Sequence, residues 1–147
     1  MRQPAYDHVQ GFWLLKTEPG DYSYDDLEND VSTIWDGVGN NLALIHMREV
    51  REDDRAFIYH TGRERKIIGI AKVISDPYPD PERDDPKRVV FDVEAEERLE
   101  TPVTLAQVKD DPEFSDWDLV RNPRLSVMPV EPEHWEKILE MAGAEEG

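Results

Sequence analysis

The chain of 147 residues contains no cysteine. That absence excludes disulfide bonds, thiolate catalysis and zinc sites built on cysteine ligands. Histidine is sparse as well, and none of the four forms an H-x-x-x-H pair: His8, His46, His60 and His134. We therefore expect neither a structural nor a catalytic metal, and no other cofactor is implied.

Long apolar runs are also missing, since none approaches the ~20 residues that a membrane helix needs. Residues 1–10 are polar, and the apolar run 12–15 is too short for the core of a signal peptide. We expect a cytoplasmic protein with no membrane partner.

Basic residues are few: 17 Lys and Arg stand against 34 Asp and Glu, which gives a net charge of −17. Such a surface repels nucleic acid at low salt. At about 1 M salt the Debye length falls to ~3 Å, and most of this repulsion is screened. The acid excess and the scarcity of lysine suit a salt-rich cytoplasm, so we favour a halophilic source. An ordinary acidic protein is the alternative.

The length fits one domain. We expect a flexible N-terminal lead over 1–10, the domain over 11–143 and a tail over 144–147, in a monomer or weak homodimer. Expected strands cover 12–16, 32–35, 55–60, 66–74, 88–95 and 125–130. Short helices are expected after Ser23, over 41–49, from 102 to 108 and over 132–141, with capping side chains at Ser23, Asn40 or Asn41, and Thr104. This order predicts an α+β fold around a small, mostly antiparallel sheet or barrel.

The first strand shows the clearest pattern in the chain. Four apolar residues, 12–15, fit a strand buried on both faces, and Pro19 requires the strand to end before it. Lys16, Thr17 and Glu18 are thus presented at the end of a core strand, where a rigid scaffold suits a binding site. The alternative is that they are solvated charges at a strand end.

Several separated segments resemble the EVE domain family together. They are Trp13-Leu14-Leu15-Lys16-Thr17-Glu18-Pro19, Trp35-Asp36-Gly37-Val38, Tyr59-His60-Thr61, the glycine strand Ile68-Gly69-Ile70-Ala71-Lys72-Val73 with Tyr78-Pro79-Asp80, and Arg124-Leu125-Ser126-Val127-Met128-Pro129-Val130 followed by Trp135 and 138–143. The resemblance runs in order from about residue 12 to 143. It implies a PUA-like fold, a small twisted β-barrel with short helices packed around it, related to YTH readers. It also implies a pocket for a modified base of DNA or RNA.

The sequence departs from the family pattern after Val38. Gly39 stands where the family has an arginine, and Leu44 falls near a second one. Arginines there would be natural phosphate contacts. In their place we consider Lys16, Arg48, Arg51 and Arg124. Weak contact with the backbone, or binding of a free base or nucleotide, is the alternative.

A base reader needs an aromatic face for stacking, polar groups for the base edge and cations for the phosphate. The candidate pocket residues are Trp13, Lys16, Thr17, Glu18, Trp35, Asp36, Gly37, His60, Arg124, Leu125 and Ser126. Trp35 precedes a turn and is the first candidate for stacking, although a core position is the alternative, and Trp13 favours the core.

The remaining candidates leave alternatives open as well. Thr17 and Ser126 could bond local backbone instead, and Glu18 could form an ion pair with Lys16 or Arg124. Neighbouring strand residues face opposite ways, so we expect His60 nearer the pocket and Tyr59 packed inside.

Two more tryptophans lie outside this set of candidates. Trp135 shares a helix face with Leu139 and is expected in the core. Trp117 lies in an acidic segment and is expected to be a lid or surface anchor.

These patterns favour a non-catalytic reader of a modified nucleobase, with nucleic acid as its partner. A small enzyme acting on nucleotides or nucleic acid is the first alternative. Against it, the chain has no G-x-S-x-G motif and no phosphate-binding loop. A module that binds another small ligand is the second alternative.

Overall fold

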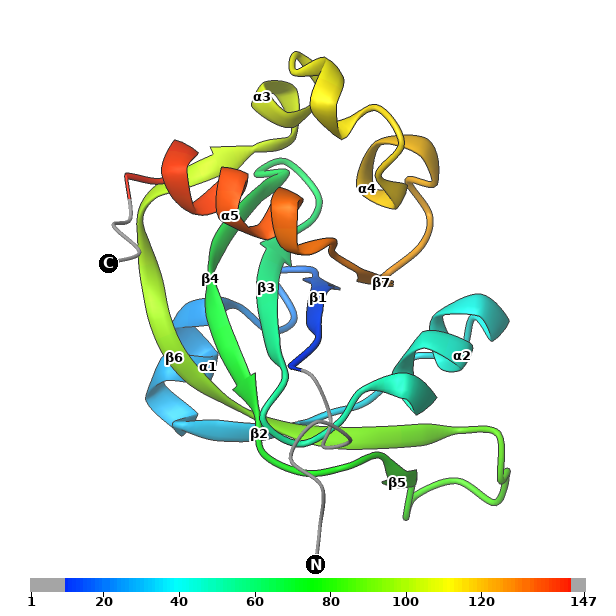
Figure 1. The fold of residues 1–147 in the computed structure, drawn as a ribbon. Coiled ribbons are helices and arrows are strands. Elements are labelled where there is room, and N and C mark those ends of the chain that lie inside the picture. Colours follow the sequence, from blue (N-terminus) through cyan, green and yellow to red (C-terminus); the bar gives the residue numbers. More distant parts are fainter. Residues whose placement is uncertain (1–9, 144–147) are drawn as a thin grey trace, which may run out of the picture.

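The computed structural model describes residues 10–143 (Figure 1), so the expected tail and nearly all of the expected lead lie outside the described residues. The strands are β1 (Phe12–Thr17), β2 (Ser32–Trp35), β3 (Arg55–His60), β4 (Lys66–Val73), β5 (Tyr78–Pro79), β6 (Val89–Thr104) and β7 (Val127–Pro129). The helices are α1 (Tyr24–Asp30), α2 (Asn41–Glu49), α3 (Leu105–Lys109), the 3₁₀ helix η2 (Pro112–Phe114), α4 (Asp118–Arg121) and α5 (Pro132–Met141). The predicted α+β class is confirmed.

One sheet organises these elements. Its strand order is β2-β6-β4-β3-β1-β7, and β5 pairs with β6. Every pairing is antiparallel except that of β1 with β3. The sheet curls into a half-barrel, with α5 lying across β3 and β4 and with α3 and α4 at one end (Figure 1). Within the part of the chain that the structure describes, no helix is both long and apolar enough to cross a bilayer.

Three helix starts form where the side-chain pattern predicts them. The Ser23 hydroxyl accepts from the Asp26 amide at 3.1 Å, and the Asn40 side chain accepts from the Ala43 amide at 3.0 Å. Thr104 caps α3 in the same way. Each cap satisfies amide groups that the first helical turn leaves without a partner, and it depends only on residues nearby in the chain.

The core is built around Trp135 of α5. Its ring stacks on Phe57 of β3 at 3.9 Å between centroids and lies 4.6 Å from Phe12 of β1, which confirms its predicted core position. The expectation for Trp117 was wrong. This residue is only 4% exposed and packs near Phe114, because the short helices η2 and α4 turn the apolar side chains of an acidic segment inward.

The strand expected over 88–95 is longer in the structure, since β6 continues to Thr104. Glu96, Glu97 and Arg98 are exposed or half-exposed charged residues, and they interrupt the apolar alternation that marks a strand in sequence. Register shifts in the pairing with β4 mark the bend of this long strand. Because β6 extends to Thr104, helix α3 begins at Leu105 and not at residue 102.

A glycine inside an apolar strand predicts a bulge or a close backbone approach, and Gly69 in β4 shows both. The pairing register of β4 with β6 shifts beside it, and the ring of Tyr24 lies against its backbone. A Cβ at this position would lie 2.5 Å from Cζ of Tyr24. The ring cannot move away easily, because Tyr24 is 1% exposed and its hydroxyl donates to the carbonyl of Ile70 at 2.7 Å.

We expect Gly69→Ala to lower the free energy of unfolding by about 1–3 kcal/mol, the usual cost of overpacking a core. Urea unfolding followed by circular dichroism measures this change. Gly39→Ala is the matched control, because its Cβ would meet only the flexible end of Arg88 at 3.4 Å. Equal unfolding midpoints for the two variants would contradict the packing argument.

Candidate functional site

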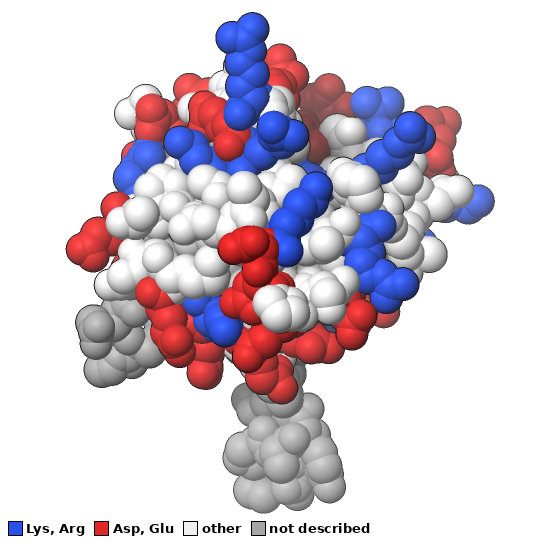
Figure 2. Space-filling view, turned by 90° about the horizontal axis from the view of Figure 1, so that it is seen from above, with Lys and Arg blue, Asp and Glu red and all other residues white. Residues whose placement is uncertain are grey.

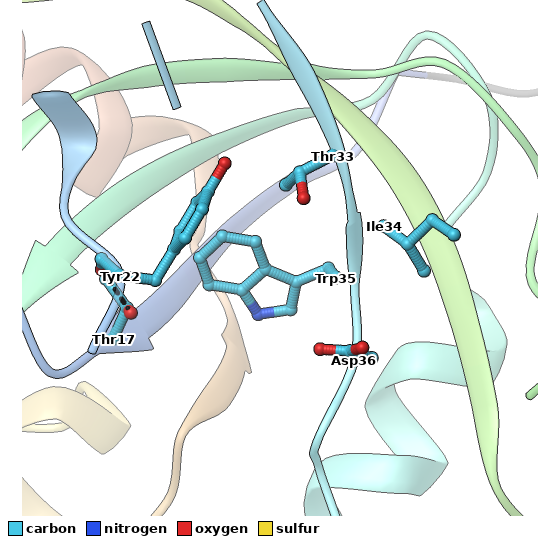
Figure 3. Close-up of a pocket in the computed structure, with 6 residues that line it drawn as sticks. All are labelled: Thr17, Tyr22, Thr33, Ile34, Trp35 and Asp36. Carbon is cyan, nitrogen blue, oxygen red and sulfur yellow. Dashed lines mark hydrogen bonds between the residues drawn. The ribbon is translucent and has the colours of Figure 1, made fainter. Parts of the chain in front are cut away.

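A pocket of about 370 Å³ lies between the end of β1, the loop that follows it, and β2. It is lined by Thr17, Tyr22, Thr33, Ile34, Trp35 and Asp36. Figure 3 shows the phenol of Tyr22 and the indole of Trp35 together in the pocket, with Asp36 beside them. Its volume is within the range of about 300–1,000 Å³ typical of small-molecule sites.

The turn after β1 forms one wall of the pocket. Glu18 accepts through its carbonyl from the amides of Asp21 and Tyr22, both at 2.9 Å, and so reverses the chain just past Pro19. The Thr17 hydroxyl then donates to the carbonyl of Tyr22 at 2.6 Å (Figure 3). This bond uses the single hydroxyl proton of Thr17, so towards a ligand this oxygen can only accept.

Strand β2 forms the opposite wall. Thr33 and Trp35 are two residues apart and lie on the pocket side, whereas Ile34 points to the other side of the strand (Figure 3). The ring centroids of Trp35 and Tyr22 are 6.4 Å apart at 81°, an edge-to-face pair. Trp35 is 6% exposed, so it is a core residue that also lines the pocket. Its indole N–H donates to no residue in the described range 10–143.

Electrostatics keep the Tyr22 phenol neutral and fixed. Burial raises the pKa of Tyr22, and the nearby carboxylate of Asp30 acts in the same direction. The phenol donates to Oδ2 of Asp30 at 2.8 Å, which holds the ring against Trp35. The carboxyl group of Asp36, by contrast, belongs to an exposed residue at the pocket. The site therefore combines aromatic walls with a hydroxyl and a carboxylate.

Three of the expected site residues line this pocket: Thr17, Trp35 and Asp36. Gly37 follows directly with φ +80°, a conformation that glycine adopts without strain. Trp13 lies elsewhere in the core, 7% exposed, and donates from Nε1 to Oδ2 of Asp54 at 2.9 Å.

His60 also lies outside the pocket lining, although we expected it to be the residue nearer the pocket. Its Nε2 accepts from the amide of Tyr24 at 3.0 Å, and its Nδ1 lies 2.8 Å from Oε1 of Glu64. An accepting Nε2 places the ring proton on Nδ1. The histidine thus fixes the start of α1, two residues after Tyr22 of the pocket.

The remaining expected residues lie on the other side of β1. The amide of Lys16 donates to the carbonyl of Ser126 at 3.0 Å, so the segment 124–126 runs beside the strand end. Leu125 is 2% exposed and Arg124 is exposed. Glu18 accepts from the Gly20 amide at 2.7 Å and forms no ion pair with Lys16 or Arg124 among residues 10–143.

Three of the four candidate phosphate contacts donate to backbone carbonyls. Lys16 Nζ donates to Pro123 at 2.8 Å, and burial lowers the pKa of this ammonium group. Arg48 donates to the carbonyl of Lys87, and Arg51 donates to those of Arg48 and Val50.

Three residues of the pocket were missed in the sequence: Tyr22, Thr33 and Ile34. The period-two alternation of a strand would have placed Thr33 beside Trp35. Tyr22 gave no comparable signal, because a turn brings it to the pocket. Arg88 was missed as well. Its guanidinium lies 3.4 Å from the position that a Cβ on Gly39 would occupy, so the residue just before β6 supplies an arginine where the loop has none.

Across the described residues, no cluster of three or more His, Asp or Glu side chains is arranged to hold a metal ion. The polar groups of the pocket suit hydrogen bonding to a flat, partly polar ligand.

The model of the EVE domain family matches residues 11–141. Thymocyte nuclear protein 1 of Rattus norvegicus is 26% identical over 172 residues, which cover 94% of this chain and 76% of the rat protein. The human protein of that name is 25% identical, with 91% of this chain and 75% of its own length covered.

Solved structures agree with these matches. A protein of Rhodopseudomonas palustris superposes with a TM-score of 0.86 at 41% identity, covering 90% of this chain and 93% of its own. Human THYN1 in complex with DNA containing 5-methylcytosine gives 0.84 at 26% identity, covering 92% and 99%. An ASCH protein of Zymomonas mobilis gives 0.59 at 12% identity, covering 90% and 96%, which is a likeness of fold alone.

Proposed function

The chain belongs to the EVE domain family, and from this premise we propose that it binds DNA by taking one modified base into the pocket that Trp35 and Tyr22 line. The observation that carries the proposal is the pocket itself, which combines an indole face, a phenol and a carboxylate in about 370 Å³. The human relative solved with 5-methylcytosine DNA supports 5-methylcytosine as the first base to test.

The polar groups around Trp35 fit the edge of a cytosine ring. Cytosine presents its exocyclic amine as a hydrogen-bond donor, and a carboxylate is its usual side-chain acceptor. Asp36 can accept from this amine, and Thr17 offers a second acceptor because its own proton is already used.

Binding inside the pocket requires the base to leave the helix stack. Unstacking costs a few kcal/mol, and stacking on an aromatic side chain returns about 1–3 kcal/mol per base. Cations near the mouth must then hold the backbone against a net protein charge of −17. Arg88 is the additional cation we propose beside the candidates Lys16, Arg48, Arg51 and Arg124, because its guanidinium lies at the loop that follows Trp35.

Fluorescence anisotropy with matched oligonucleotides tests this function. One arm carries 5-methylcytosine and the other cytosine, each as single-stranded DNA, duplex DNA and RNA, at 0.1 M and 1 M KCl. Burial of one methyl group contributes ~0.8 kcal/mol, so we expect about fourfold tighter binding of the modified DNA. At 1 M KCl, salt screens most of the repulsion between the acidic protein surface and the nucleic acid.

Equal affinity for modified and unmodified strands at both salt concentrations would contradict the proposal. Preference for modified RNA over modified DNA would assign RNA as the partner and would leave the role of the pocket unchanged. Mass spectrometry of the recovered oligonucleotide provides the control for catalysis. A change in the mass of the oligonucleotide would show that the protein is an enzyme and not a reader.

A further inference from the structure

A cationic groove lies on the other side of β1 from the Trp35 pocket. It consists of two hollows of about 230 Å³ and 220 Å³ that share Arg65, Leu105 and Lys109. Lys16 and Arg63 complete its set of basic residues. The turn between β3 and β4 and helix α3 form its walls. Figure 2 views the end of the molecule that carries these elements, and Lys and Arg side chains border a largely uncharged surface there.

The charge of this groove is opposite to that of the whole protein. Its lining contains four cations and one acid, Glu64, which already contacts Nδ1 of His60 at 2.8 Å. Several cations elsewhere, although not all, are paired with carboxylates, as in Arg55 with Glu96 at 3.0 Å.

The four basic side chains of the groove, by contrast, form no ion pair with any residue between 10 and 143: Lys16, Arg63, Arg65 and Lys109. On a chain with net charge −17, such a cluster of positive charge without acidic partners indicates an anionic ligand.

The walls of the groove are held in place by backbone bonds. The amide of Leu105 donates to the carbonyl of Arg65 at 2.8 Å, which ties the β3–β4 turn to α3. Lys16 Nζ is held over the ring of Tyr59, 5.6 Å from its centroid. One further carboxylate lies at the rim, that of Glu18, with Oε2 2.7 Å from where a Cβ on Gly62 would be. The walls of the groove and the ammonium group of Lys16 are therefore positioned before any ligand arrives.

The groove and the pocket meet at the end of β1. Thr17 lines the pocket and Lys16 lines the groove, because successive strand residues face opposite ways. Thr61, which also lines the groove, donates through its amide to the carbonyl of Thr17 at 2.9 Å. Neighbouring Cα atoms are about 3.8 Å apart, and a nucleic acid strand advances ~3.4 Å per nucleotide. A strand with one base in the pocket therefore has phosphates within reach of the groove.

We propose that the cationic groove binds the phosphodiester backbone of the strand whose base enters the Trp35 pocket. This assignment rests on the proposed function. A positively charged groove beside an aromatic platform is the arrangement by which proteins hold single strands. An acidic peptide is the competing ligand, but it would have no use for the adjoining aromatic pocket.

The test compares two double variants with the same change in net charge. Arg65→Gln with Lys109→Gln removes two groove cations, both exposed, so the fold should persist. Lys72→Gln with Arg83→Gln is the control, since these cations lie outside the groove and pair with Asp53 and Asp80. Binding of a single-stranded oligonucleotide containing 5-methylcytosine is measured between 0.1 M and 1 M KCl.

Each phosphate contact contributes about 0.7 to the slope of log K against log salt for a single strand. We expect the groove variant to bind more weakly and to reduce this slope by about 1.4, which is ~25-fold over a tenfold change in KCl. We expect the control to keep the slope of the parent protein. Equal slopes for the two double variants would overturn the groove assignment.

Two further probes separate this proposal from the function on which it rests. The nucleoside 5-methyl-2′-deoxycytidine has no phosphate, so the groove variant should bind it like the parent protein. If the parent protein does not bind the nucleoside and does not prefer modified strands, the proposal that the pocket binds a modified base is wrong. A slope of log K against log salt that falls in the groove variant would still support the groove as the phosphate site. Groove-dependent binding of polyglutamate, without binding of the oligonucleotide, would overturn the proposal in favour of an acidic protein partner.

Discussion

Replacing Trp35 with leucine is expected to weaken binding of an oligonucleotide containing 5-methylcytosine by about 5- to 150-fold, the equivalent of ~1–3 kcal/mol for loss of one stacked base. Leucine keeps an apolar side chain on β2 but removes the flat aromatic face. Anisotropy titration at constant KCl measures the change. The effect should be equally large for the free nucleoside, because the contact involves only the base.

The burial of Trp35 makes a control for stability necessary. The residue is 6% exposed, so the substitution also removes core contacts. Trp13→Leu is the matched control, since Trp13 is 7% exposed on β1 and lines no part of the pocket. Both variants should unfold at lower urea concentration, and only Trp35→Leu should lose affinity in its folded form. Equal loss of affinity in the two variants would contradict the assignment of Trp35 as the stacking platform.

Replacing Asp54 with alanine is expected to lower the free energy of unfolding by about 3–5 kcal/mol. Asp54 is 0% exposed and accepts from three groups: the amide of Gly11 at 2.8 Å, Nε1 of Trp13 at 2.9 Å and the amide of Arg51 at 2.9 Å. Alanine would leave these donors without an acceptor, and an unsatisfied buried donor costs ~1–3 kcal/mol. The predicted loss is a large share of the 5–15 kcal/mol typical of a domain.

Urea unfolding again provides the measurement. Asp84→Ala makes the same change in net charge at an exposed position and should leave the unfolding midpoint nearly unchanged. Asp54→Asn should fall between the two, because an amide keeps one accepting oxygen and replaces the other with a donor. If Asp54→Ala matched the Asp84→Ala control, the three hydrogen bonds would not be contributing to stability.

Much of the fold follows from local chemistry in the sequence. Ser23, Asn40 and Thr104 cap helices because each side chain satisfies amides only a few residues away. The apolar run 12–15 forms a buried strand that ends before Pro19. Gly69 predicted a close approach without naming its partner, since the ring of Tyr24 reaches it from a distant part of the chain.

The site could be predicted only in part. Lys16, Thr17 and Glu18 form one group in the sequence, yet strand alternation sends Lys16 to the groove and Thr17 to the pocket. Asp54 lies in a polar run whose composition suggests exposure, and two of its three donors, Gly11 and Trp13, come from a segment more than 40 residues away in the chain.

The sequence by itself determined the family resemblance, most strand and helix positions, and Trp35 and Thr17 as candidates for one site. The tertiary structure alone decided that Tyr22 completes the pocket, that Trp117 is buried, and that Arg65 and Lys109 join Lys16 in one groove. The physical reason is the distance along the chain over which each feature acts. Caps and apolar periods act between residues close in the chain, whereas a pocket or a charged groove exists only where the folded sheet brings distant segments together.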